Sequence, residues 1–162
     1  MASFADFQGN EKLPVGTHSV KIVAVDKGTN RNGGVKIIVK FMDLDQREFD
    51  HNLQIQANMM WACDKFLREL GLTEKERRDI DFDKNFPESD IDVILNYFKT
   101  KVIDRLCDIE TYNKEYNGKE YMNLKAITPF TGDKEKYMFL TGEFAKNETH
   151  INVPASSSDC PF

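Results

Sequence analysis

The chain has 162 residues, of which 40% are hydrophobic and 30% are charged, and its net charge is −5. These values are typical of a globular protein whose core is large enough to fold without disulfide bonds. No run of about 18 apolar residues occurs, which excludes a membrane-spanning helix, and the N-terminal residues lack the basic-then-apolar order of a signal peptide.

The first part of the chain predicts a loose arm, residues 1–12, followed by a strand and a turn. From Pro14 onward apolar and polar side chains alternate, as in a half-buried strand. One side of this strand carries Val20, Ile22 and Ala24, and the other carries Ser19, Lys21 and Val23. The sequence NRNGG at residues 30–34 then predicts a tight turn, because glycine and asparagine tolerate positive φ.

Two more strands are expected before the pattern changes. In residues 35–44, Ile37, Val39 and Phe41 share one face, with Lys36, Ile38 and Lys40 on the other. Residues 47–55 alternate in the same way, and their apolar face carries Phe49, His51, Leu53 and Ile55. Short turns between these segments predict an antiparallel meander.

Residues 57–100 have helical periodicity instead. A first helix is expected to begin at Asn58 and to end at Gly71, and a capping box at Thr73 predicts a second. An acidic loop over residues 79–87 precedes a third helix from Ser89. Residues 102–112 and 121–130 then predict a hairpin around Asn117-Gly118. After Pro129 the pattern fades, and the last residues have the composition of a disordered tail.

Three strands, a helical segment and two strands follow one another in the order of an oligonucleotide-binding (OB) fold. The predicted fold class is therefore mainly β: a five-stranded OB barrel over residues 1–130, with a helical insert at 57–100. Residues 131–162 are expected to be an extension and a flexible C-terminal tail.

An OB barrel binds single strands through lysines that contact phosphates and aromatic rings that stack on bases. The candidate DNA-binding side chains here are basic residues interleaved with tyrosines on neighbouring strands. They are Lys21, Arg31, Lys36, Lys40, Tyr112, Tyr116, Lys119, Tyr121 and Lys125, with Lys27 close to the first turn. Taken singly, each lysine is equally explained by solubility, and Tyr121 by packing on Tyr112 across the hairpin.

Other side chains are interpreted as structural. Trp61 lies near the core stripe of its helix, and His51 is expected to be a polar group with satisfied hydrogen bonds. The cysteines Cys63, Cys107 and Cys160 are far apart, and no CxxC occurs, which favours reduced thiols over a disulfide framework or a zinc site. No catalytic motif is present, so neither an enzyme nor a cofactor is expected.

Two stretches resemble a family of small bacteriophage proteins. The first is LPVGTHSVKIVAVDKGT with GGVKIIVKFMDLDQREFDHNLQI and the helix end FLRELGL, and the second is IETYNKEYNGKEYMNLKAI. The resemblance covers roughly residues 13–128. It implies a single-stranded DNA-binding protein that acts in phage DNA replication, recombination and repair, in the cytoplasm of the infected bacterial host.

The C-terminal residues Asp159, Cys160, Pro161 and Phe162 resemble the Asp-Ile/Leu-Pro-Phe tip of bacterial single-stranded DNA-binding proteins. The resemblance implies that Phe162 enters an apolar pocket of a replication or recombination partner. The chain departs from the family in having Asp159 as the one acid near its end, which implies a weaker contact. Family members often act as oligomers or cooperative arrays, and the sequence leaves the oligomeric state of this chain open. The alternative left open by the low basicity is an OB-fold adaptor that binds proteins and no DNA.

Overall fold

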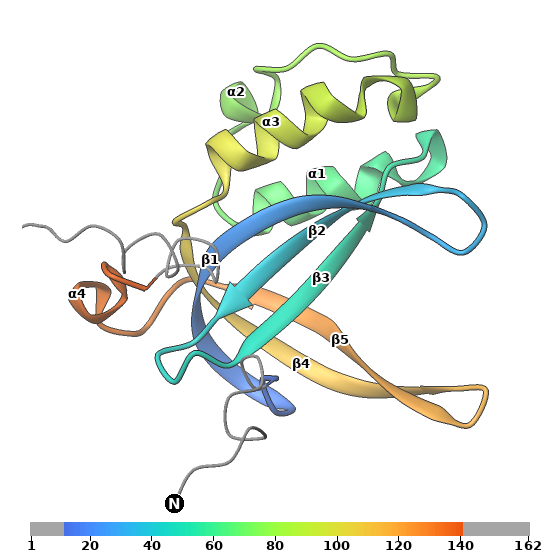
Figure 1. Ribbon diagram of the computed structural model, residues 1–162. Helices are drawn as coiled ribbons and strands as arrows, with labels where there is room; N and C mark the ends of the chain where they lie inside the picture. The colour runs from blue at the N-terminus through green and yellow to red at the C-terminus, as the bar shows by residue number, and fades with distance from the viewer. Residues whose placement is uncertain (1–11, 141–162) are drawn as a thin grey trace, which may run out of the picture.

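The computed structural model describes residues 12–140, and within this range the chain forms a five-stranded antiparallel sheet with helices at one end (Figure 1). The strands are β1 (Gly16–Thr29), β2 (Val35–Met42), β3 (Glu48–Gln54), β4 (Leu106–Tyr116) and β5 (Lys119–Thr128). The helices are η2 (Ala57–Met59), α1 (Met60–Glu69), α2 (Glu74–Arg77), η3 (Pro87–Asp90), α3 (Ile91–Lys101) and α4 (Lys134–Tyr137). None of these helices is long and apolar enough to cross a membrane.

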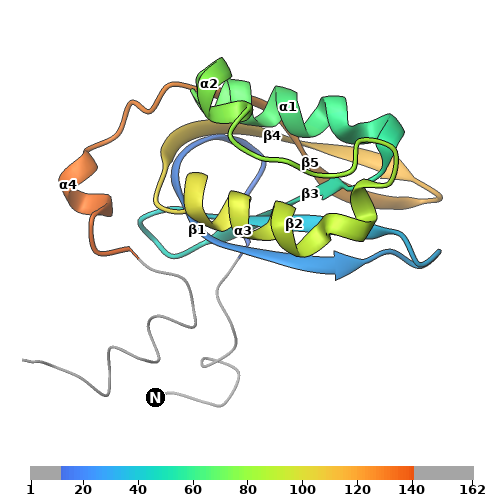
Figure 2. The same cartoon turned by 90° about the horizontal axis from the view of Figure 1, so that it is seen from above.

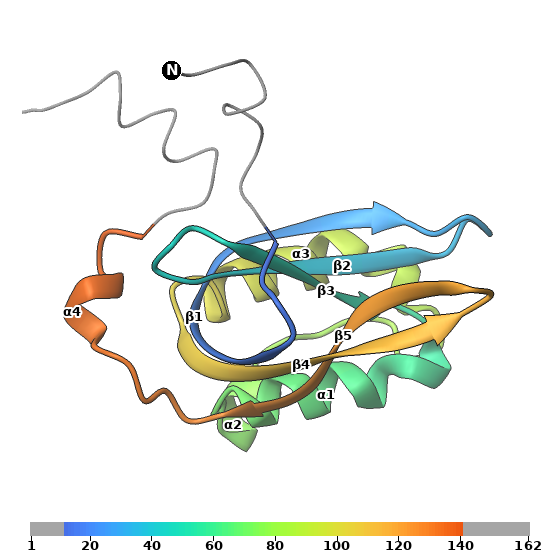
Figure 3. The same ribbon diagram turned by 90° about the horizontal axis from the view of Figure 1, so that it is seen from below.

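The strand order in the sheet is β3-β2-β1-β4-β5, so that β1 pairs with both β2 and β4. This confirms a mainly β fold in which all of these helices except α4 lie between the third and fourth strands. The sheet curls strongly, as Figures 1 and 3 show. However, its edge strands β3 and β5 form no ladder with each other within residues 12–140, so the sheet is not a closed barrel.

Both predicted hairpin turns are confirmed. Residues 30–34 close the first turn with a hydrogen bond from the Asn30 amide to the Gly34 carbonyl at 2.8 Å. In the second turn, Asn117 and Gly118 have φ of 53° and 78°. Two consecutive positive φ angles favour the twist of an antiparallel hairpin, and they explain why asparagine and glycine occupy the turn. Both turns point to the same end of the molecule in all three ribbon views.

The alternation predicted for the first strand fails at one point. A β-bulge between Ile22 and Ala24 shifts the register of β1 against β2. A bulge inserts one extra residue and moves the following side chains to the other face. As a result Ala24 lies opposite Lys40 on the outer face, whereas Val25, opposite Val39, is buried.

The helices that connect β3 to β4 follow the predicted signals in part. Gly71 ends α1 with φ of 97°, and Thr73 and Glu76 form the expected capping box, with the Thr73 hydroxyl accepting from the Glu76 amide at 3.1 Å. The cap expected at Asn58 is wrong, because this residue lies inside η2, which leads directly into α1. The predicted helix start at Ser89 is likewise a 3-10 turn, η3, before α3.

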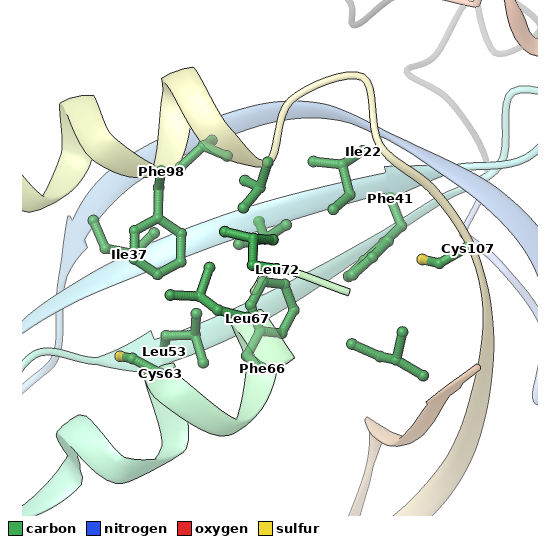
Figure 4. Packing of buried hydrophobic residues seen from close by; sticks show 14 of the residues in the cluster. Ile22, Ile37, Phe41, Leu53, Cys63, Phe66, Leu67, Leu72, Phe98 and Cys107 are labelled. Carbon is green, nitrogen blue, oxygen red and sulfur yellow. The ribbon is translucent and has the colours of Figure 1, made fainter. Parts of the chain in front are cut away.

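The core lies between the concave face of the sheet and helices α1 and α3, which cover the same end of the molecule (Figure 2). Phe66 of α1 contacts both the other helix and the sheet, since its ring stacks on Phe98 of α3 and packs edge-on against Phe41 of β2. Figure 4 shows these rings surrounded by aliphatic side chains from the strands. The predicted inward face of β2, with Ile37 and Val39, is fully buried.

The segment after β5 has structure that its sequence pattern did not predict. Residues 130–140 return to the outer face of the sheet, where α4 buries Tyr137 and Leu140 against Met42 (Figure 1). The Tyr137 hydroxyl donates to the Ser19 carbonyl at 2.9 Å. This small second cluster lies at the end of the molecule opposite the two hairpin turns.

Candidate functional site

The β4–β5 hairpin gathers most of the predicted stacking residues on one face. Directly opposed residues of antiparallel strands point to the same side. The register pairs Tyr112 with Asn123, Lys114 with Tyr121, and Tyr116 with Lys119. We call these six residues the tyrosine face. Its three rings are 38–62% exposed, so the prediction that they lie outside the core is confirmed.

The lysines of β2 lie on the same outer face of the sheet but apart from the tyrosine face, because β1 lies between β2 and the β4–β5 hairpin. Lys36 stands opposite Gln54, and Lys40 stands opposite Asp50. The ammonium group of Lys40 forms an ion pair with Glu48 at 3.1 Å. Burial raises the pKa of Asp50, and the nearby Lys40 opposes that shift. The positive charge of Lys40 is therefore mainly compensated by the carboxylates of Glu48 and Asp50 in β3.

Lys21 is not on a solvent-exposed face, and this expectation was wrong. Alternation with the buried Val20 and Ile22 does turn the Lys21 side chain outward, but α4 covers this side chain, and Lys21 is 6% exposed. The ammonium group donates to the carbonyls of Tyr137 at 3.1 Å and Met138 at 3.3 Å. Asp104 lies 3.5 Å away. Lys21 thus holds the segment after β5 in place.

The remaining predicted cations are exposed. Arg31 lies in the β1–β2 turn, at the same end of the molecule as the β4–β5 turn. Lys125 follows the tyrosine face along β5 and forms an exposed ion pair with Glu110 at 3.5 Å. Lys27 is paired with Asp92 of α3 at 2.9 Å. The partner-binding tip, Asp159 to Phe162, lies outside the described residues.

A cleft of about 200 Å³ lies between the two edge strands and α1. We call it the edge cleft. Its walls come from residues 51–54 of β3, one side of α1 from Trp61 to Glu69, and residues 124–126 of β5. Trp61 stands at its rim and is 62% exposed, which corrects its predicted place in the core.

The helical wheel explains the exposure of Trp61. The buried side chains of α1 are Cys63, Phe66 and Leu67. Trp61 lies four residues before Lys65, and residues at this spacing share one side of a helix. Both side chains therefore face the edge cleft, beside the buried stripe. The sequence contained this signal, since Trp61 is out of phase with the stripe.

His51 lines the edge cleft as well. Its ring stacks on Phe66, with centroids 5.5 Å apart, and it forms no hydrogen bond with any residue that the structure describes. The expectation of a satisfied polar group is therefore wrong for this part of the chain. Burial lowers the pKa of His51 to about 4, so the imidazole is neutral at physiological pH.

A second cleft, of about 450 Å³, also lies between β3 and β5, and it is acidic. Its walls carry the carboxylates of Glu48, Asp50 and Glu120, with Lys12 as the one cation among its lining residues. By register, Glu115 and Glu120 share the side of the hairpin opposite the tyrosine face, but Tyr121 of the tyrosine face also lines this acidic cleft. A continuous basic trough from Lys40 to the tyrosines is therefore not formed.

No group of three His, Cys, Asp or Glu side chains among residues 12–140 is arranged to hold a metal ion. Burial raises the pKa of Cys63 and of Cys107 to about 12, so both thiols stay protonated and are poor nucleophiles. What the surface does offer is exposed rings, amides and ammonium groups, which suit binding.

A comparison of the chain with models of known protein families gave no match, and a comparison with curated protein sequences gave none either.

Proposed function

We propose that this chain binds single-stranded DNA without sequence preference, in the manner of the phage proteins that its sequence resembles. The observation that carries the proposal is the tyrosine face: three exposed rings that alternate with Lys114 and Lys119 along one side of the β4–β5 hairpin. Rings stack on any base and ammonium groups contact phosphates, so this pattern needs no particular sequence.

The strand connectivity supports an OB-type fold. Strand β1 pairs with both β2 and β4, and all helices except α4 lie between β3 and β4. The OB fold is a partly open five-stranded barrel, and the gap between β3 and β5 is compatible with that description. The β1–β2 and β4–β5 turns, which flank the ligand in OB proteins, point to one end of the molecule here.

A variant of the hairpin tests the proposal. We expect Tyr112→Ala, Tyr116→Ala and Tyr121→Ala, combined in one chain, to weaken binding of a fluorescent dT oligonucleotide at least tenfold, since each stacked base contributes ~1–3 kcal/mol. Because the rings are exposed, the fold is retained. The triple Tyr→Phe variant keeps the rings and is expected to bind as the unmodified protein does. Equal affinity of the alanine variant would refute the role of the tyrosine face.

Function in the infected cell follows from the same resemblance. The chain would coat exposed strands during phage DNA replication, recombination and repair, in the cytoplasm of the bacterial host. Its Asp159–Phe162 tip would recruit a replication or recombination protein through a rigid aromatic side chain. Removing Pro161 and Phe162 is then expected to leave dT affinity unchanged and to abolish capture of that partner.

A protein-binding adaptor is the second candidate function, and the acidic cleft favours it. Glu48, Asp50 and Glu120 repel phosphates, and a basic protein surface would complement them. A gel shift with a single-stranded oligonucleotide separates the two functions, because the adaptor binds no DNA.

A further inference from the structure

The edge cleft combines features that the tyrosine face lacks. Trp61 offers the larger ring surface, and it is accessible although Cys63, Phe66 and Leu67 of the same helix are buried in the core. Lys65 stands one turn further along α1 and forms no ion pair with any of residues 12–140. Across the cleft, Lys125 of β5 provides a second ammonium group, and Glu69 is the one carboxylate among the lining residues.

Polar groups without internal partners also face this cleft. The neutral imidazole of His51 has a donor and an acceptor, and neither is used within the described chain. The side-chain carbonyl of Gln54 accepts a hydrogen bond from the side-chain amide of Asn30. This leaves the side-chain NH₂ group of Gln54 as a donor. A planar ligand with donors and acceptors along its edge, such as a nucleobase, matches this combination of a ring and unpaired polar groups.

The edge cleft adjoins the tyrosine face through a single strand. Along β5, Tyr121 and Asn123 belong to the tyrosine face, and Leu124 and Lys125 line the cleft. At about 3.3 Å per residue, Tyr121 and Lys125 are roughly 13 Å apart along the strand. A polynucleotide on the tyrosine face therefore reaches the cleft within a few nucleotides, inside the ~4–16 nucleotides that one OB fold binds.

We propose that the helical insert provides a base-stacking site: Trp61 stacks on one base of the bound single strand, and Lys65 and Lys125 contact its flanking phosphates. This inference rests on the proposed function and deepens it. It assigns the insert a direct part in binding, beyond covering the core.

Trp61 is the only tryptophan in the chain, so its fluorescence reports on this site alone. The full-length protein is titrated with a dT oligonucleotide, and binding is followed in parallel by the anisotropy of a labelled oligonucleotide. We expect Trp61 emission to be quenched at the same oligonucleotide concentrations at which anisotropy rises. We expect Trp61→Ala to weaken binding roughly 5- to 150-fold, and Trp61→Phe to retain most of the affinity.

A matched control is Phe139→Ala, which removes an 84% exposed ring next to α4, at the opposite end of the molecule. It is expected to bind as the unmodified protein does. Circular dichroism verifies that both alanine variants are folded.

The outcomes separate the inference from the proposed function. Binding without quenching of Trp61, or normal affinity of Trp61→Ala, overturns the stacking site and leaves the proposed function standing. Absence of any binding by the unmodified protein overturns both. Quenching by a basic peptide, with no response to the oligonucleotide, would assign the cleft to a protein partner instead.

Discussion

At the scale of single residues, position in the folded chain decides which polar side chains are available to a ligand. Lys21 and Lys119 look equivalent in sequence, since both alternate with apolar or aromatic residues along a strand. Lys119 is exposed beside Tyr116, whereas Lys21 is buried under α4. The difference comes from residues more than one hundred positions away, which no local pattern contains.

His51 makes stability dependent on pH. Burial lowers its pKa from 6.5 to about 4 in the folded protein, so the unfolded chain binds a proton in a range where the folded one does not. Stability is therefore fully present above pH 6.5 and decreases as the pH falls towards 4, by about 3 kcal/mol if His51 acts alone.

Urea unfolding at pH 7.5, 6.5 and 5.5 measures this effect. The variant His51→Phe keeps a ring against Phe66 and cannot titrate, so we expect its unfolding free energy to change little over this interval. A parallel decrease in both proteins would show that other groups are responsible.

At the scale of elements, the strands and their turns were predicted from sequence, and their irregularities were not. Alternation of side chains placed β2 and β3 within about two residues, and Asn117-Gly118 fixed the second hairpin. The bulge after Ile22 escaped prediction, because it depends on how β1 bends to pair with two neighbours. The start of β4 at Leu106 was also missed, since α3 continues to Lys101 and the turn that follows gives Asp104 a φ of 74°.

The helical insert shows which structural features a sequence pattern predicts and which it misses. Capping at Thr73 and termination at Gly71 were predicted because both depend on a few adjacent residues. The exposure of Trp61 was in principle visible from its phase on α1. Its place beside β5 was not, because the edge cleft joins residues 61 and 125 through the curl of the sheet.

The segment of residues 130–140 tests the structural role of Lys21. We expect Lys21→Ala to lower the unfolding free energy by about 1–3 kcal/mol, because it removes the donor to the Tyr137 and Met138 carbonyls. Affinity for dT oligonucleotides is expected to stay unchanged.

The matched variant Lys119→Ala is expected to show the reverse: unchanged stability in urea and weaker DNA binding. If Lys21→Ala instead weakened binding without loss of stability, its place beneath α4 would be contradicted.

At the scale of the whole molecule, the distribution of charge matters more than its sum. The net charge of −5 is unfavourable for binding the phosphates of DNA, and the acidic cleft between β3 and β5 adds to this. Lys36, Lys114, Lys119 and Lys125 lie on the outer face of the sheet together with the exposed tyrosines, and of these four Lys125 is in an exposed ion pair with Glu110. The account therefore predicts local attraction on an otherwise acidic protein.

The dependence of dT binding on salt tests this account most directly. Each neutralised phosphate of a single strand contributes about −0.7 to the slope of log affinity against log salt. Three or four contacts predict a slope of about −2 to −3, which corresponds to a roughly 40- to 150-fold loss of affinity between about 50 and 300 mM salt. Equal affinity at the two concentrations, or no binding at either, would contradict the proposal that this sheet holds a single strand of DNA.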